Sequence, residues 1–196
     1  MRANGLSVGL AVAILLPALG VAGRAMVRHE QTPAARGAIV ISATGGGKSF
    51  VTNPAPAIGI AEFSFSAVQH EDGTASGMFR MVRQRAGFNV DFTGTVTCLA
   101  VDPVTHRAWI GGVVVHNNSD DPNHTTAIHE PGQDVWFRVV DNGEGADTPA
   151  DRSSVYGFKG AGGVQTSAEY CALRLWPAGE ANAFELTQGN IQVHPR

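Results

Sequence analysis

The sequence predicts an all-β protein, built as a single antiparallel β-sandwich or small β-barrel and stapled by one disulfide. Apolar residues alternate with polar ones from Phe88 to Cys98, which is the period of a sheet with one face in water. The chain of 196 residues contains 24 glycines and 10 prolines, which favour many turns, and sustained helical periodicity is weak. Because a sandwich and a barrel share this alternation, both architectures remain open.

The strands are predicted in quick succession between turn-forming residues. The first strand, 38–42, is expected to end at glycines 45–47, and Pro54 and Pro56 exclude a central strand in the next segment. Asp72-Gly73 predicts a hairpin turn, because this dipeptide tolerates the positive φ that such turns need. The other strands that this alternation predicts are 60–69, 75–84, 88–98, 107–116, 134–139, 184–186 and 190–194.

Three details of this pattern concern Cys98, Gly94 and the segment around Cys171. Cys98 shares the apolar phase of its strand, which places it on the inner face of the sheet. Gly94 keeps that phase and marks a bend or bulge. The segment 166–173 is the one helix candidate of any length, but Cys171, Leu173 and Leu175 alternate with their neighbours, which favours a strand.

The first 25 residues have the features of a secretory signal peptide. Arg2 precedes an apolar run from Leu6 to Leu19, and cleavage is predicted after Ala22 or Ala25. The alternative is an uncleaved anchor, but the 17 residues from Leu6 to Ala22 are at the short edge of the ~20 residues needed to cross a bilayer. The chain is therefore divided into a signal peptide (1–25), a disordered lead-in (26–37) and a single β domain (38–196), with no membrane span after cleavage.

Export predicts a secreted or periplasmic protein, and this compartment decides how the two cysteines are interpreted. Oxidising conditions favour a disulfide between Cys98 and Cys171 over a free thiol or a pair of metal ligands. Cleavage after Ala25 removes two of the 14 basic residues and none of the 17 acidic ones, which leaves a net charge of about −5. Without a basic block, nucleic-acid binding is not expected.

Two polar loops contain the candidate metal ligands. The segment 116–130 collects His116, His124 and His129 with three carboxylates, and imidazole with carboxylate can hold zinc or another transition metal. These carboxylates are Asp120, Asp121 and Glu130. A solvated polar loop is the simpler interpretation, because the spacing of the histidines is not that of a helical face.

The second loop is a glycine-containing acidic turn. Asp141, Glu144, Asp147 and Asp151 offer oxygen ligands of the kind that calcium prefers, although the twelve-residue EF-hand spacing is absent. An exposed acidic turn is the simpler interpretation here as well. The sequence therefore predicts no cofactor, with calcium as the alternative.

Familiar catalytic motifs do not fit this chain. The glycines 45–47 precede Lys48-Ser49, but the P-loop spacing and its following helix are missing. Neither the Gly-x-Ser-x-Gly elbow of serine hydrolases nor the His-Glu-x-x-His motif of zinc proteases is present. Carboxylates predicted on strands, among them Glu62, Asp91 and Glu169, form no recognisable pair for glycoside hydrolysis. The three tryptophans, Trp109, Trp136 and Trp176, are interpreted as core packing rather than a ligand surface.

Several segments together resemble a family of uncharacterised exported bacterial β-domains. They are 44–47 (TGGG), 96–101 (VTCLAV), 107–112 (RAWIGG), 135–145 (VWFRVVDNGEG) and 189–194 (GNIQVH). The resemblance covers roughly residues 38–194. It implies the β fold, but it carries no catalytic residue, cofactor or ligand.

The function that these observations favour is a non-catalytic binding or surface-structural module. The alternative is a secreted hydrolase or small-ligand carrier, with its site in the loops or in a barrel mouth. A binding module predicts no convergent acid–base group. An enzyme predicts a concave pocket in which carboxylates or histidines meet with shifted pKa values.

Overall fold

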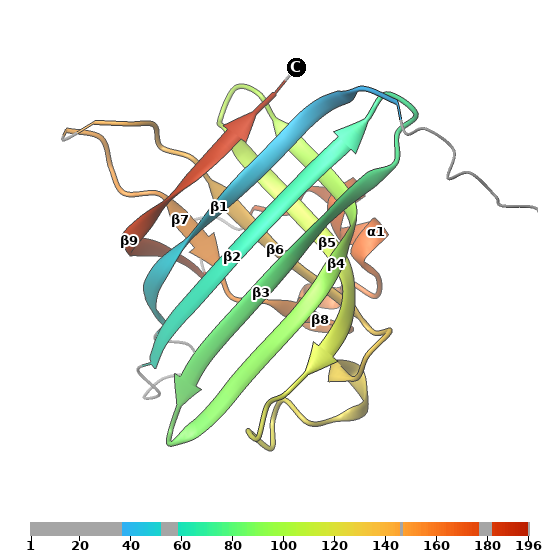
Figure 1. Cartoon of the computed structure of the whole chain (residues 1–196), viewed down its shortest axis with the longest axis vertical. Helices are drawn as coiled ribbons and strands as arrows, with labels where there is room; N and C mark the ends of the chain where they lie inside the picture. Colours follow the sequence, from blue (N-terminus) through green and yellow to red (C-terminus); the bar gives the residue numbers. More distant parts are fainter. Residues whose placement is uncertain (1–36, 52–58, 146, 177–181, 196) are drawn as a thin grey trace, which may run out of the picture. The chain divides into compact units, whose positions relative to one another are not determined.

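The computed structural model describes residues 37–51, 59–145, 147–176 and 182–195 (Figure 1). Strands dominate these residues and confirm the all-β prediction. The nine strands of the described chain are β1 (Ile39–Val51), β2 (Gly59–His70), β3 (Ala75–Arg85), β4 (Phe88–Asp102), β5 (Arg107–Asn117), β6 (Asp134–Val140), β7 (Arg152–Ser154), β8 (Gly157–Phe158) and β9 (Ala183–His194). One short helix, α1 (Ser167–Leu173), and two 3-10 turns, η1 (Ala127–His129) and η2 (Ala161–Gly163), complete the elements.

The strands form one antiparallel sheet that closes on itself. Neighbours follow the order β5-β4-β3-β2-β1-β9-β7-β6, and β5 also pairs with β6. This additional pairing joins the two ends of the series into a ring, so the described strands have the hydrogen bonding of a barrel rather than of two separate sheets. β7 and β8 pair with different parts of the same strand, β6.

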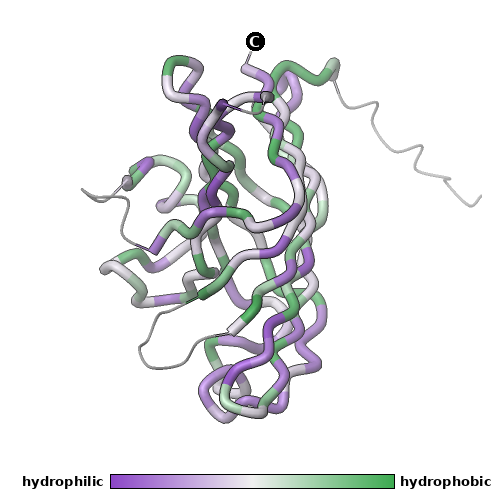
Figure 2. Tube along the Cα trace, turned by 90° about the vertical axis from the view of Figure 1, so that its left-hand side faces the viewer, coloured by the Kyte–Doolittle hydropathy of each residue, from purple (hydrophilic) through white to green (hydrophobic). Residues whose placement is uncertain are grey.

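The interior of the ring holds the main hydrophobic core. Hydrophobic and hydrophilic residues are interleaved along the strands (Figure 2), as the alternation predicts. Phe137 is at the centre of an aromatic group, with ring centroids 5.3 Å from Phe65, 5.9 Å from Phe79 and 4.7 Å from Tyr156. Gly94 lies beneath the Phe79 ring, where a Cβ atom would be 2.1 Å from Cζ, so the position requires glycine.

The predicted disulfide is present, but on the opposite face of β4 from the one expected. Cys98 and Cys171 are joined by a bond of 2.03 Å. The pairing of β4 with β5 shifts register between Val96 and Cys98, and this bulge reverses the alternation. Leu99 therefore enters the inner core, whereas Cys98 packs with a second cluster. The prediction of an inward Cys98 was wrong for this reason.

The second cluster lies on the outer face of the sheet, under α1. It contains Trp109, Trp136 and Tyr170, with the rings of Trp136 and Tyr170 stacked at 5.6 Å. Trp176 adds its ring to this cluster and lies 4.4 Å from the Arg107 guanidinium. The tryptophans therefore pack against the sheet, as the simpler interpretation predicted.

The strand predicted around Cys171 is instead the helix α1. The Thr166 side chain accepts a hydrogen bond from the Glu169 N–H, which is the N-cap that a Thr-x-x-Glu pattern favours. The Asp134 carboxylate accepts hydrogen bonds from the N–H and hydroxyl of Ser167, at 2.8 and 2.5 Å. The cap, this anchor on β6 and the disulfide together fix a helix of seven residues, which is too short to be stable by itself.

Two other boundaries differ from the predictions. The glycines 45–47 do not end the first strand but lie inside β1, where neighbouring strands approach closely; a Cβ on Gly47 would be 2.2 Å from the Gln188 carbonyl oxygen. The last two predicted strands are one continuous strand, β9.

The predicted signal peptide, the lead-in up to residue 36, and both Pro54 and Pro56 lie outside the described residues. Within the described part of the chain, no helix has the length and apolar character needed to span a membrane.

Candidate functional site

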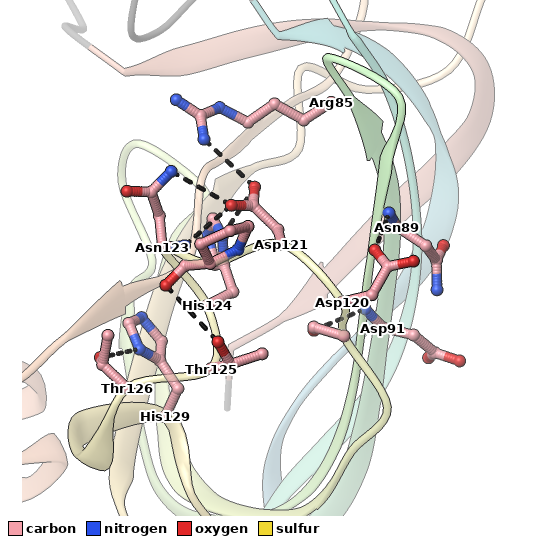
Figure 3. A network of polar contacts seen from close by, with 12 residues as sticks. Arg85, Asn89, Asp91, Asp120, Asp121, Asn123, His124, Thr125, Thr126 and His129 are labelled. Carbon is pink, nitrogen blue, oxygen red and sulfur yellow. Dashed lines mark hydrogen bonds and ion pairs between the residues drawn. The ribbon is translucent and has the colours of Figure 1, made fainter.

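The loop after β5, which sequence analysis singled out, is organised by one buried carboxylate, Asp121 (Figure 3). Arg85 Nη1 donates to Asp121 Oδ2 at 3.1 Å, and His124 Nδ1 lies 3.2 Å from the same oxygen. The other oxygen accepts from the backbone and side-chain nitrogens of Asn123, at 2.9 and 3.1 Å. Asp121 thus ties the loop to the end of β3.

The charge state of this network follows from its contacts. Burial alone would raise the pKa of Asp121, but the hydrogen bonds from Asn123 and Arg85 and the nearby His124 lower it to about 2. Burial and the positive charge of Arg83 lower the pKa of His124. At neutral pH the network therefore holds an ionised Asp121 and an uncharged His124.

His129 is the second buried imidazole of the loop. Its ring centroid is 4.2 Å from that of Phe158 and 5.3 Å from that of His124, and its Nδ1 is hydrogen-bonded to the Thr126 hydroxyl at 2.8 Å. Burial, followed by the proximity of His124, lowers the pKa of His129 from 6.5 to about 4. This histidine therefore packs as a neutral aromatic ring.

Acid is expected to destabilise the fold through His129. Between pH 6.5 and 4 the unfolded chain binds a proton that the folded protein does not, so stability falls as the pH falls, by roughly 2 kcal/mol at pH 4.5. Urea unfolding at pH 7 and pH 4.5 measures this loss. His129→Gln should reduce the difference, and an equal difference in this variant and the wild type would contradict the assignment.

The structure does not bring the six candidate ligands of this loop together. His116 is exposed on β5, opposite Thr93 of β4, and the Asp120 carboxylate accepts from the Asn89 N–H. Glu130 is exposed. Among the residues that the structure describes, no group of three or more His, Cys, Asp or Glu side chains is placed to hold a metal ion. Zinc at this loop stays a prediction.

The carboxylates of the acidic turn are used in the fold. Asp141 accepts from the N–H groups of Gly143 and Val193, and Asp151 accepts from those of Asn142 and Ile191. Glu144 accepts from the Asn190 side chain at 2.7 Å. These bonds hold the turn against β9, and Asp147 is exposed. Calcium at this turn also stays a prediction.

A pocket beside the Asp121 network is the strongest candidate site. We call it the barrel-end pocket: a cavity of about 370 Å³ whose lining comes from the end of β3, the loop after β5 and the segment 155–158. Its lining residues are Met81, Arg83, Arg85, Asn123, His124, Val155, Tyr156 and Phe158. Volumes of this size are typical of small-molecule sites.

Four lining residues carry a buried side-chain atom that has no hydrogen-bond partner among the described residues. These atoms are Arg83 Nε, Arg85 Nε, His124 Nδ1 and the Tyr156 hydroxyl oxygen. Arg83 as a whole is only 7 % exposed. Most buried polar groups in proteins are hydrogen-bonded, so four such atoms among the lining residues of one pocket are unusual.

Arg83 and Arg85 were not among the site residues predicted from the sequence, although the alternation of inward-facing residues on β3 indicated them. Phe79 and Met81 are inward-facing residues of β3, and the same alternation continues through Arg83 to Arg85. Arginines at two positions where the alternation calls for inward-facing apolar residues, at the end of a strand, indicate charged side chains directed into the barrel. The candidate carboxylates Glu62 and Asp91, by contrast, form ion pairs with Lys48 and Arg80 outside the pocket.

In comparisons with known proteins, no family model, no curated protein and no solved structure matches this chain. The resemblance to exported bacterial β-domains therefore stays a prediction. Function is inferred from the chemistry of the pocket and its surroundings.

Proposed function

We propose that this protein is a non-catalytic binding protein, which holds a small ligand in the barrel-end pocket. The observation that carries the proposal is the pocket itself, whose lining combines apolar side chains with the buried arginine Arg83. Met81, Tyr156 and Phe158 supply the apolar surface, and Arg83 supplies the buried cation. This combination of apolar surface with a few fixed polar groups is characteristic of ligand sites.

Asp121 and His124 meet beside the pocket with shifted pKa values, as the enzyme alternative predicts, but the pocket chemistry favours binding over hydrolysis. None of the eight lining residues is a serine, a cysteine or a carboxylate. The adjacent Asp121 already has both oxygens occupied by Arg85 and Asn123. His124 therefore has an orienting carboxylate but no nucleophile beside it in the pocket, and a hydrolytic mechanism would need one.

Two matched fluorescent probes test the function with the oxidised full-length protein. N-phenyl-1-naphthylamine is neutral, and anilinonaphthalene sulfonate is its sulfonated derivative. Binding of at least one is expected, and Val155→Trp should abolish it by filling the cavity. Val104→Trp, at an exposed position in the turn between β4 and β5, is the control and should bind like the wild type. The proposal is wrong if neither probe binds or if Val155→Trp binds normally.

We also propose that the protein is exported, as the N-terminal signal and the resemblance to exported bacterial domains suggest. The Cys98–Cys171 disulfide supports this location, because such bonds persist in oxidising compartments. The mass of the protein recovered from a secreting bacterium is expected to lack residues 1–22 or 1–25. Recovery of the full-length chain would contradict cleavage.

A further inference from the structure

We infer that the ligand of the barrel-end pocket is a small amphipathic monocarboxylate, whose carboxylate is bound by Arg83. This inference rests on the proposed function and adds the chemical class of the ligand. Three observations support it. Arg83 lies on the inward face of β3, the charged side chains around the pocket have a net positive charge, and apolar side chains line the same pocket.

The Arg83 side chain is placed to receive an anion. It follows Met81 on the inward face of β3, it lines the cavity, and its Nε has no hydrogen-bond partner among the described residues. Burial of this guanidinium is costly and lowers the pKa of Arg83, and an anion in the pocket would offset that cost. Its planar fork of donors matches the two oxygens of a carboxylate.

The neighbouring residue Arg85 does not compete for this role. Its Nη1 is committed to Asp121, which is completely buried. The two ions of that pair cancel, and His124 and His129 are neutral rings at pH 7. Two cations, Arg83 and Arg85, and one anion, Asp121, leave this group with a net charge of +1, so the pocket matches a ligand with a single negative charge rather than a dianion.

The rest of the ligand is defined by the apolar residues that line the same pocket. Met81, Val155 and Phe158 contribute apolar surface, and Tyr156 contributes a ring. A compact apolar body is expected to contact these side chains.

The test compares 1-naphthoate with 1-naphthamide, which have similar shapes and differ in charge. Isothermal titration calorimetry with the oxidised full-length protein at pH 7.5 should show naphthoate binding at least tenfold more tightly. Arg83→Met should remove this preference by weakening naphthoate alone. Arg83→Lys, which keeps the charge but not the fork, should restore part of it.

The matched control is Arg80→Met on the same strand. Arg80 is exposed on the outer face and paired with Asp91, so this variant should keep the wild-type preference. Arg83→Met should fold with a thermal midpoint equal to or above that of the wild type, because it removes an unpaired buried charge. A clear drop in the midpoint would show that Arg83 is already satisfied within the fold and would overturn the inference.

The outcomes separate the two proposals. Equal binding of naphthoate and naphthamide, or a preference that survives in Arg83→Met, would overturn the carboxylate assignment while the binding function stands. Failure of both compounds and of both fluorescent probes would overturn the binding function itself.

Discussion

Replacing Phe137 with alanine is expected to lower the free energy of unfolding by about 3–5 kcal/mol. Phe137 is 1 % exposed and lies between the rings of Phe65, Phe79 and Tyr156. The loss combines the transfer of a buried ring with a cavity that a closed sheet cannot easily collapse, and it also removes three aromatic contacts. Urea unfolding followed by circular dichroism measures it.

Phe50 provides the matched control for this prediction. It is 52 % exposed on β1, so Phe50→Ala should change the free energy of unfolding by less than about 0.5 kcal/mol. Similar losses in the two variants would contradict the placement of Phe137 at the centre of the inner core.

Reduction of the disulfide is expected to cost about 4 kcal/mol, because the bond removes chain entropy from the unfolded state. Cys98 and Cys171 are 73 residues apart, so the closed loop is long. Reduction also removes the covalent link between α1 and β4, which leaves α1 held by its N-cap, by Asp134 and by packing. Once α1 loosens, Trp109 and Trp136 should become more exposed, with a red shift in tryptophan emission.

The measurement compares urea unfolding with and without reductant, together with the double variant Cys98→Ala/Cys171→Ala. The double variant should lose about as much stability as the reduced wild type and should not respond to reductant. Alkylation of the native, unreduced protein should label no thiol. Two labelled thiols, or identical unfolding midpoints with and without reductant, would contradict this role of the bond.

Most strands could be predicted from the sequence, because each has one face in the core and the side-chain alternation reports it directly. The segments 60–69 and 75–84 match β2 and β3 within one residue at each end. The Asp72-Gly73 turn also follows from local chemistry, and Gly73 has the positive φ of 81° that this dipeptide favours.

The errors arose where tertiary packing overrides local pattern. The bulge at Val96–Cys98 adds one residue to β4, and the sequence has no separate signal for it. The helix α1 is so short that its alternation resembles a strand, although the Thr166-x-x-Glu169 cap could have identified it. The glycines 45–47 resemble a strand end, but in β1 they permit close approach of the neighbouring backbone.

The candidate site was only half predicted. The loop 116–130 contributes Asn123 and His124 to the pocket, and its histidines drew attention to it. Arg83 and Val155 come from segments distant in sequence, and no local pattern could show that they line the same cavity. Only the closed sheet brings the inward-facing Arg83 and the apolar residue Val155 into the lining of one pocket.

That closure also determines how the protein resists self-association. β5 and β6 satisfy each other along Arg107–Val113, so neither offers a free row of backbone donors and acceptors to another molecule. The junctions of β7 are much shorter: it pairs with β9 over Arg152–Ser154 and with β6 only at Arg152 and Ser153. Fibril growth by edge-to-edge strand addition would therefore begin with fraying of β7, and amide hydrogen exchange should be faster there than along the β5–β6 boundary.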